Sequence, residues 1–287
     1  MNDCRLFCDS SGSWYTDKDV KDRLLKVQAP DCDVLFVHSD MGFGLPARGL
    51  SRNEYLGRFF QLIAETGVKT IIYPTFTYSF CNGEDYDVRS SKTSMGALNE
   101  YARKVAGNNR SLDPLLSVVV FGEQPERFIK PQTCHSLGAN SIFDILHHTP
   151  NVKFLFFGAE FSNCFTYVHY VEKMLDVPYR FDMPFEGKIT DWEGNFFERQ
   201  QYIHTACEKI KPVDFYHFKD FLIENGCLRV EKLGDREIAT ISEPDAYYWI
   251  KTKIAERMDY FLAKSFTDAD LAHKYTYDRA NGRITHC

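Results

Sequence analysis

The chain has 287 residues and a formal net charge of −6, with 44% hydrophobic and 26% charged residues. This composition is typical of a soluble globular protein that can bury a large core, and the negative charge argues against a nucleic-acid surface. No apolar run approaches the ~18 residues of a membrane helix, and the polar N-terminus lacks a signal-peptide core. Nine cysteines without a disulfide framework predict a reducing, cytoplasmic environment. We therefore expect a cytoplasmic protein with no nucleic-acid partner and no membrane partner.

Strand and helix patterns alternate through the first half of the chain. Short apolar runs predict strands at 33–38, 69–73, 115–121 and 153–157. Amphipathic patterns predict helices at 20–27, 51–65, 95–105 and 141–148. Ser51 with Glu54, and Ser141 with Asp144, have the spacing of a capping box. Such alternation predicts mainly parallel strands with helices on both faces of the sheet.

The second half of the chain has a different pattern. Strand-like segments flank 191–195 and again 234–236, which predicts two β-hairpins, and a long amphipathic helix is expected over 243–264. Residues 265–287 are polar and predict a surface tail. We expect a single domain over 1–287 with its core at about 33–264. The predicted fold class is α/β: a three-layer α/β/α sandwich with a mixed, mainly parallel central sheet and a C-terminal β-hairpin/helix extension.

The segment most suggestive of chemistry contains His169 and Glu172. Thr166 can cap a helix that starts there, which places His169 in the first turn and Glu172 three residues later on the same face. The positive end of the helix dipole favours a neutral imidazole, and a carboxylate one turn away can orient that ring. The pattern predicts a general base, although many His-x-x-Glu pairs on helices are ordinary solvated neighbours.

Other kinds of site fit the sequence less well. The cysteines and histidines do not pair at the spacing of a zinc site, so we expect no metal. Residues 138–142 depart from the nucleophile elbow of a serine hydrolase. The Gly42-Phe43-Gly44 segment has too few glycines for a dinucleotide-binding loop.

Three segments beside predicted strands are candidates for binding a phosphate or a pantetheine amide. They are 38–42, 74–77 and 110–117, which offer backbone N–H groups, hydroxyls and one arginine. Each of them could equally be an ordinary turn. The polar and aromatic stretch 78–92 predicts a long loop of the kind that often covers a binding site.

A set of short motifs follows in order along residues 33–262. The set comprises Val37-His38-Ser39, Pro74-Thr75-Phe76-Thr77, Met95-Gly96 with Glu100 and Arg103, Gly107, Arg110-Ser111, Pro114, Ser117, Gly122, Gly158, Thr166-x-x-His169-x-x-Glu172 and Val177-Pro178-Tyr179-Arg180. In this order the motifs resemble the aminoglycoside 3-N-acetyltransferase-like family, acyl-CoA-dependent N-acyltransferases distinct from the GNAT enzymes. The resemblance implies an enzyme that uses acetyl-CoA or another acyl-CoA as co-substrate and transfers the acyl group directly to an amine.

The chain departs from the family pattern at three places. Asp40 stands where the family usually has a second serine, and Asp113 stands where it has a histidine. Residues 45–50 replace a glycine-rich segment. The resemblance therefore identifies a divergent member, and the acceptor is the property that transfers least.

The resemblance assigns the catalytic roles to His169, as the base, and to Glu172, which orients the imidazole. We predict that CoA is bound by His38, Ser39, Asp40, Met41, Gly42, Thr75, Arg110 and Ser117. Backbone N–H groups of the 39–42 loop would stabilise the thioester oxygen. We predict that the acceptor is bound by Tyr78, Glu84, Asp85, Asp113 and Arg180.

The acceptor is predicted from the charges of the 78–92 segment. Acidic residues there are accompanied by Arg89 and Lys92, a mixture that suits a single amine better than a polycation. We therefore expect an amino-sugar acceptor, a deoxy-amino sugar linked to a nucleotide. One alternative is an aminoglycoside 3-N-acetyltransferase that confers antibiotic resistance. A second alternative is a catalytically silent CoA-binding or sugar-binding protein. A homodimer through the hairpins or the tail is also compatible with the sequence.

Overall fold

The central sheet of the computed structural model, which describes residues 5–130, 133–213, 215–278 and 283–286, has six strands. Their order is β11-β12-β8-β3-β5-β7. The strands are β3 (Val34–Ser39), β5 (Thr70–Pro74), β7 (Val118–Gly122), β8 (Val152–Phe157), β11 (Arg229–Leu233) and β12 (Arg236–Ser242). β3 pairs in parallel with β5 and β8, whereas β7 and β12 run antiparallel to their inner neighbours. Because β11 is antiparallel to β12, four of the six strands point the same way, and the mixed, mainly parallel sheet is confirmed.

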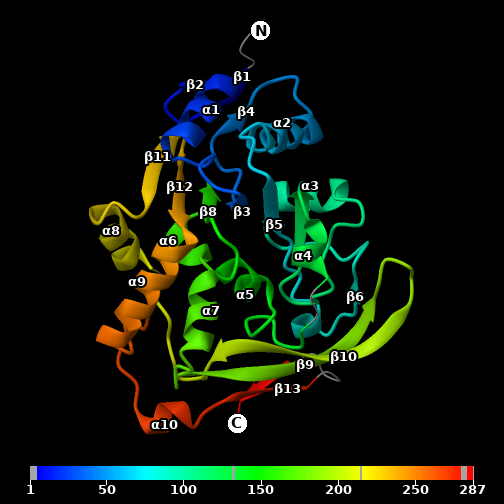
Figure 1. The fold of residues 1–287 in the computed structure, drawn as a ribbon, viewed down its shortest axis with the longest axis vertical. Coiled ribbons are helices and arrows are strands. Elements are labelled where there is room, and N and C mark those ends of the chain that lie inside the picture. The colour runs from blue at the N-terminus through cyan, green and yellow to red at the C-terminus, as the bar shows by residue number, and fades with distance from the viewer. Residues whose placement is uncertain (1–4, 131–132, 214, 279–282, 287) are drawn as a thin grey trace.

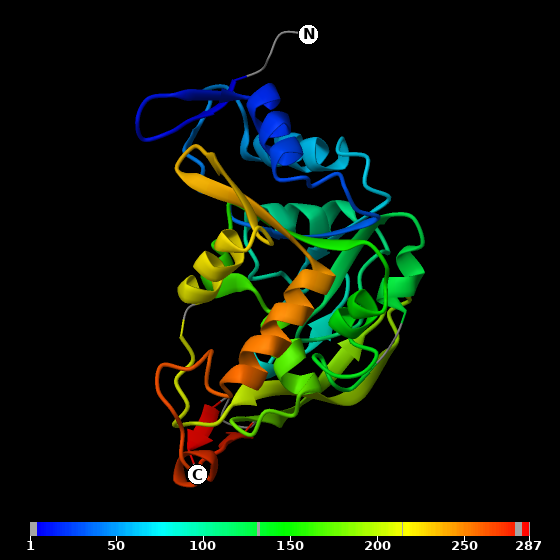
Figure 2. The same cartoon turned by 60° about the vertical axis from the view of Figure 1, so that its left-hand side comes forward.

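Helices cover both faces of this sheet, as Figures 1 and 2 show. One face carries α1 (Asp17–Lys26), α2 (Arg52–Ala64) and α3 (Ala97–Val105), and the other carries α5 (Ile142–His147), α7 (Tyr167–Met174) and α9 (Glu243–Glu256). All six residues of β3 are buried, and its side chains alternate between two cores. Leu35 and Val37 pack with α1, α2 and α3, and Phe36 packs on the opposite side. The three-layer sandwich is thereby confirmed.

Helix caps explain where several helices begin. The Ser51 and Glu54 box is confirmed: the Ser51 N–H donates to Glu54 Oε2 at 2.8 Å, and the Glu54 N–H donates to Ser51 Oγ at 3.3 Å. The second box is only half formed. Ser141 Oγ accepts from the Asp144 N–H, but the Asp144 carboxylate accepts from the Asn140 N–H instead.

The second half of the chain forms the two predicted hairpins. β9 (Arg180–Thr190) and β10 (Phe196–Ala206) pair over their full lengths, and with β6 (Tyr86–Asp87) they make a separate sheet below the central one in Figure 1. β11 and β12 form the other hairpin. α9 ends at Glu256, not at residue 264, because Arg257 adopts an extended backbone. The shorter elements are β1 (Arg5–Cys8), β2 (Trp14–Thr16), β4 (Leu45–Pro46), η1 (Phe80–Asn82), α4 (Pro125–Ile129), α6 (Phe161–Cys164), α8 (Tyr216–Glu224), α10 (Asp268–Leu271), β13 (Tyr275–Asp278) and β14 (Arg283–His286).

The 78–92 segment is not an open loop, contrary to the sequence prediction. It contains η1 and β6, and Phe80, Tyr86 and Val88 are fully buried. The Val88 N–H donates to the Thr190 carbonyl, which ties the segment to β9. Its alternating aromatic and apolar residues therefore form part of the core. Within the described ranges, none of the helices combines the length and apolar character needed to cross a membrane.

Candidate active site

The chain reaches α7 through the short helix α6, which follows β8. Thr166 does not cap α7 as predicted: its backbone is already helical, with φ −58° and ψ −25°, and its hydroxyl donates to the Cys164 carbonyl at 3.4 Å. The cause is local, because α6 ends only two residues before Thr166. His169 nevertheless lies in the first turn of α7, as the sequence predicts.

His169 and Glu172 are in contact on one face of α7. His169 Nδ1 lies 2.8 Å from Glu172 Oε2, and the two side chains are 30% and 1% exposed. An ionised carboxylate can only accept a hydrogen bond, so Nδ1 carries the proton in this contact. The other ring nitrogen, Nε2, then holds a free lone pair. The geometry therefore presents Nε2 as the basic atom.

Glu172 is held in its ionised form by two further contacts. The Tyr179 hydroxyl donates to Oε1 at 2.8 Å, and Arg180 Nε forms an ion pair with Oε2 at 2.7 Å. Burial by itself would raise the pKa of this carboxyl group. The Arg180 cation, followed by His169 and Tyr179, outweighs burial and lowers the pKa of Glu172 to about 2.

The same surroundings keep the imidazole neutral. Burial and then the Arg180 cation lower the pKa of His169, and they outweigh the opposite effect of Glu172. A neutral ring at physiological pH can accept a proton, which is the requirement for a general base.

His169 lines a cavity of about 340 Å³, close to the lower end for ligand sites. A cavity of this size suits the reacting end of a ligand. Arg180 is the charged side chain among the described residues of the lining. The complete lining is Ser162, Asn163, Cys164, Phe165, Thr166, His169, Arg180, Thr205, Ala206, Pro212, Val213 and Phe215.

The predicted CoA-binding loop 38–42 lies behind one wall of this cavity. The His38 ring stacks on Phe156 at 5.1 Å and meets the edge of Phe165, a lining residue, at 6.5 Å. Burial lowers the pKa of His38 to about 3, so the ring is neutral. The N–H groups of Asp40 and Gly42 donate to the Phe157 carbonyl and to Asp40 Oδ1. Two of the loop's possible oxyanion donors are thus engaged within the protein.

The remaining residues of that loop face other parts of the fold. Met41 packs against the core on the α2 side, and the Asp40 carboxylate lies 3.7 Å from Arg236. The Ser39 hydroxyl donates to Asn99 Oδ1, and Asn99 Nδ2 donates to the Pro74 carbonyl at 2.7 Å. Ser39 thereby joins the end of β3 to the end of β5.

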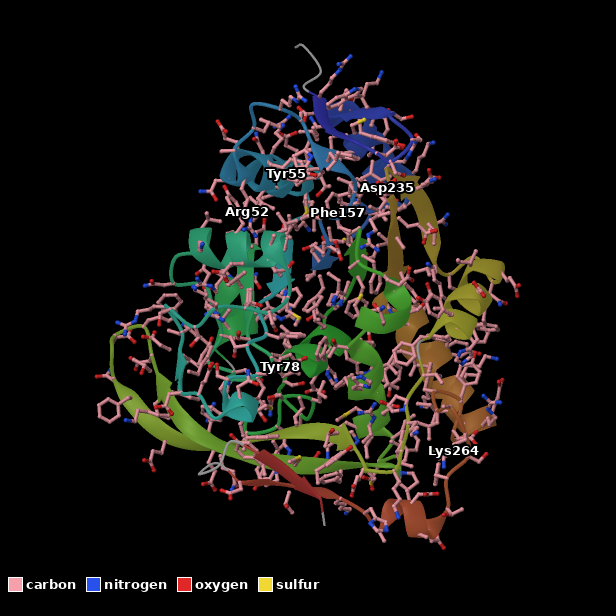
Figure 3. The ribbon with its side chains drawn as sticks, turned by 180° about the vertical axis from the view of Figure 1, so that it is seen from behind. Arg52, Tyr55, Tyr78, Phe157, Asp235 and Lys264 are labelled. Carbon is pink, nitrogen blue, oxygen red and sulfur yellow. The ribbon has the colours of Figure 1, made fainter. Side chains whose placement is uncertain are left out.

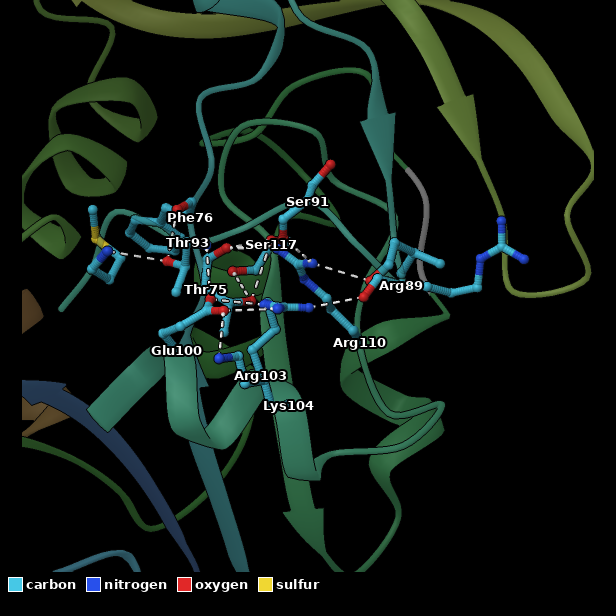
Figure 4. Close-up of polar contacts among 12 residues, drawn as sticks. Thr75, Phe76, Arg89, Ser91, Thr93, Glu100, Arg103, Lys104, Arg110 and Ser117 are labelled. Carbon is cyan, nitrogen blue, oxygen red and sulfur yellow. Dashed lines mark hydrogen bonds and ion pairs between the residues drawn. The ribbon is translucent and has the colours of Figure 1, made fainter. Parts of the chain in front are cut away.

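Thr75, Arg110 and Ser117 form a buried hydrogen-bonded cluster, shown in Figure 4. Arg110 is 2% exposed and donates to the carbonyls of Thr75, Val88 and Ser91 and to Ser117 Oγ. The structure therefore brings these three predicted CoA-binding residues together. It does so in the interior, where their polar groups bind one another.

Four predicted acceptor-binding residues lie outside the lining of the His169 cavity. Asp113 is buried against the N–H groups of Leu115 and Leu116 beside a separate cavity of about 20 Å³, and burial raises its pKa. Tyr78 lies between the central strands and the β9–β10 hairpin in Figure 3. Asp85 accepts from the Lys188 N–H at 2.9 Å, and Glu84 is exposed. Arg180, the fifth predicted residue, does line the His169 cavity.

The sequence prediction assigned no role to a second histidine–carboxylate pair beside this cavity. His204 Nδ1 lies 3.0 Å from Asp182 Oδ1, and Lys173 Nζ lies 2.6 Å from Asp182 Oδ2. Asp182 and His204 are direct partners in the β9–β10 register, so the hairpin prediction with a known register could have found them. The described residues contain no group of histidine, cysteine and acidic side chains that could hold a metal ion.

Comparisons with known proteins agree with this arrangement. The sequence profile of the aminoglycoside 3-N-acetyltransferase family matches residues 47–254. The apoenzyme of aminoglycoside acetyltransferase AAC(3)-IVa has 18% identity and a TM-score of 0.67, over 86% of this chain and 91% of that chain. AAC-IIIb, in a binary structure with CoASH, has 18% identity and a TM-score of 0.68, over 88% and 99%. The YokD protein from Bacillus subtilis has 16% identity and a TM-score of 0.69, over 85% and 94%.

At these identities the solved structures show the fold alone, and a comparison with curated proteins gives no match. The family match carries the stronger conclusion because it covers more than half of the chain. The protein therefore belongs to the aminoglycoside 3-N-acetyltransferase family, whose members are acyl-CoA-dependent N-acetyltransferases with acetyl-CoA as co-substrate.

Proposed function

We propose that this protein transfers an acetyl group from acetyl-CoA to an amine of an aminoglycoside, with His169 as the general base. One observation carries the proposal: His169 faces a cavity while its Nδ1 is held by an ionised, buried Glu172. This arrangement leaves Nε2 as the proton acceptor. The sequence prediction favoured a nucleotide-linked amino sugar, but membership of the family supports the aminoglycoside alternative better.

The chemistry requires a base because an ammonium group has no lone pair with which to attack a carbonyl. His169 Nε2 takes a proton from the acceptor amine, directly or through one water, as the amine approaches. The imidazolium so formed is stabilised by Glu172, which lies 2.8 Å from Nδ1. Acetyl-CoA supplies an activated acyl group, and the cavity has room for its reacting end. Holding the two substrates in line contributes about 7–11 kcal/mol in well-oriented systems.

A second acceptor class is favoured by one feature of the cavity. Its described lining contains the cation Arg180 and no carboxylate, whereas a polycationic aminoglycoside is attracted by negative groups. A sugar with a single amine places less positive charge beside Arg180. Solved relatives hold a gentamicin, apramycin and sisomicin, which makes these compounds suitable probes.

The role of His169 can be tested with His169→Ala in an assay of thiol release from acetyl-CoA. We expect the rate to fall by about 10²–10⁴, the usual contribution of a general base. His147→Ala is a matched control, because His147 Nδ1 also lies 2.8 Å from a buried glutamate, Glu243, and its side chain is 27% exposed. The control should retain its rate. Equal losses in both variants would contradict the assignment.

The acceptor can be tested with the wild-type protein and a panel of amines. Faster turnover of gentamicin, apramycin or sisomicin than of a deoxy-amino-sugar nucleotide supports the aminoglycoside acceptor. The reverse order supports the single-amine sugar. Binding of CoA without thiol release for any amine would instead indicate a catalytically silent binding protein.

A further inference from the structure

We propose that Arg180 is a positioning residue, which holds Glu172 in place so that His169 presents a neutral Nε2 to the acceptor amine. The inference rests on the proposed function, because it assigns to Arg180 a part in the same proton transfer. It differs from the sequence prediction, in which Arg180 binds the acceptor. The difference lies in which atoms the guanidinium contacts.

The guanidinium is held at two points by the protein itself. Its Nε lies 2.7 Å from Glu172 Oε2, and its Nη1 donates to the His204 carbonyl at 3.3 Å. The side chain is 7% exposed. Arg180 is the first residue of β9 and pairs with Ala206 at the end of β10. Because the two contacts lie on α7 and β10, they determine where the planar guanidinium stands relative to the helix that carries His169.

The contacts around Glu172 divide its oxygen atoms among three partners. Oε1 accepts from the Tyr179 hydroxyl, and Oε2 faces both His169 Nδ1 and Arg180 Nε. A carboxylate that is 1% exposed must have partners of this kind to remain ionised. Without the guanidinium, the remaining cation available to Glu172 would be a protonated His169. Arg180 thus takes the place that an imidazolium would otherwise occupy.

The groups that face His169 come from several elements. Glu172 lies on α7, Arg180 on β9 and His204 on β10, and the Phe215 ring stands 6.4 Å away. Of these groups, Arg180 disfavours protonation of the imidazole and Glu172 favours it. The balance keeps the ring neutral until the amine delivers a proton, after which Glu172 stabilises the cation.

A positioning role and a substrate-binding role predict different kinetics. A residue that binds the acceptor lowers its KM, so its loss should raise the KM for that substrate. Arg180 is instead neutralised by Glu172, and its contacts are with the protein. Replacing it should lower kcat at neutral pH with little change in either KM, and the loss should diminish at higher pH as His169 deprotonates.

The test measures the pKa and tautomer of His169 by nitrogen-15 NMR of histidine-labelled protein. This measurement needs no substrate, so it does not depend on the acceptor or on whether His169 is the base. In Arg180→Gln we expect the pKa of His169 to rise by about one unit, since a neighbouring cation is removed. Arg180→Lys keeps the charge and should return the value to within about half a unit of wild type.

Two further variants keep the test decisive. In Glu172→Gln the Arg180 cation is unopposed, so the pKa of His169 should fall below its wild-type value, which gives a result even if Arg180→Gln does not fold. Arg103→Gln is the matched control: Arg103 also pairs with a carboxylate, Glu100, through Nε and Nη2 at 2.8 Å, and its side chain is 9% exposed. It should leave His169 unchanged. An unaltered pKa and tautomer in folded Arg180→Gln, or no fall in Glu172→Gln, would overturn the proposal.

The activity measurement separates this proposal from the proposed function. If His169→Ala retains full activity, the general-base assignment fails, whatever the NMR result. If His169→Ala is inactive but Arg180→Gln raises an acceptor KM and leaves the pKa of His169 unchanged, only the positioning role fails.

Discussion

Replacing Arg110 with methionine tests whether this arginine supports the fold or binds CoA. Its Nη1 donates to the carbonyls of Val88 and Ser91 at 3.0 and 2.7 Å, and its Nη2 donates to the Thr75 carbonyl and to Ser117 Oγ at 3.1 and 3.2 Å. Three acceptors are therefore backbone oxygens that the side chain holds together. Methionine fills a similar volume without any donor.

The cost can be worked out from those contacts. The Thr75 carbonyl keeps the hydrogen bond from Ser117 Oγ, so the Val88 and Ser91 carbonyls are the ones left short of a donor. At about 1–3 kcal/mol each, they give roughly 2–6 kcal/mol. The cation–π contact with Tyr86, at 5.1 Å, is lost as well, but the protein no longer has to bury a charge. We expect a net loss of about 3 kcal/mol, or about 6–12 °C in Tm.

Thermal unfolding followed by circular dichroism measures the loss, and calorimetric titration with CoA at a temperature where both proteins are folded measures binding. The control is Arg127→Met, an exposed arginine that donates to Thr149 Oγ1 at 2.8 Å, for which we expect at most about 0.5 kcal/mol. An unchanged Tm in Arg110→Met together with a tenfold weaker CoA affinity would refute the reasoning. Arg110 would then be a ligand contact.

Two more substitutions test the structure away from Arg110. Because the pKa of Glu172 is lowered to about 2 from an ordinary 4.5, its charge stabilises the fold above about pH 4.5 and this stabilisation disappears as the pH falls towards 2. Tm measured from pH 3 to 6 should therefore depend on pH less in Glu172→Gln than in wild type, and parallel curves would contradict this. In Gly187→Ala the new Cβ would lie 2.3 Å from the buried ring of Phe80, so denaturant unfolding should show a loss of about 1–3 kcal/mol. Glu186→Ala, next to it on the exposed face of β9, serves as control and should cost far less.

Much of the fold follows from the sequence where one local signal agrees with the packing. The apolar run ending at His38 is buried on both faces, as β3 is, and the box of Ser51 and Glu54 starts α2 where the sequence places it. The hairpin around 191–195 is also found. In each case the signal lies within a few residues, so tertiary contacts reinforce it.

The errors arise where distant partners decide the structure. The direction of β7 depends on its pairing with β5, and the apolar run at 115–121 carries no information about that. The 78–92 segment appears polar, but its apolar residues are buried against β9 and Arg110. Thr166 has the side chain of a helix cap, but α6 immediately before it already sets a helical backbone.

The two buried arginines show why site residues are harder to predict than elements. A sequence shows that Arg110 and Arg180 carry charges, and both were interpreted as ligand contacts. Whether such a charge is available to a ligand depends on the acceptors that the fold brings to it: backbone carbonyls for Arg110, and Glu172 with the His204 carbonyl for Arg180. His169 and Glu172 could be predicted because their contact is only three residues long in sequence.

This difference also determines where acceptor specificity should be sought. The acidic residues of the 78–92 segment suggested the acceptor from sequence, but none of them lines the His169 cavity among the described residues. Specificity therefore depends on the side chains around that cavity, and its described walls are formed by α6, the start of α7, the end of β10, Pro212, Val213 and Phe215. Substitutions at Asn163 or Thr205, which line the cavity without contacting Glu172, are the ones that should change the order of preference among amines while leaving the pKa of His169 unaltered.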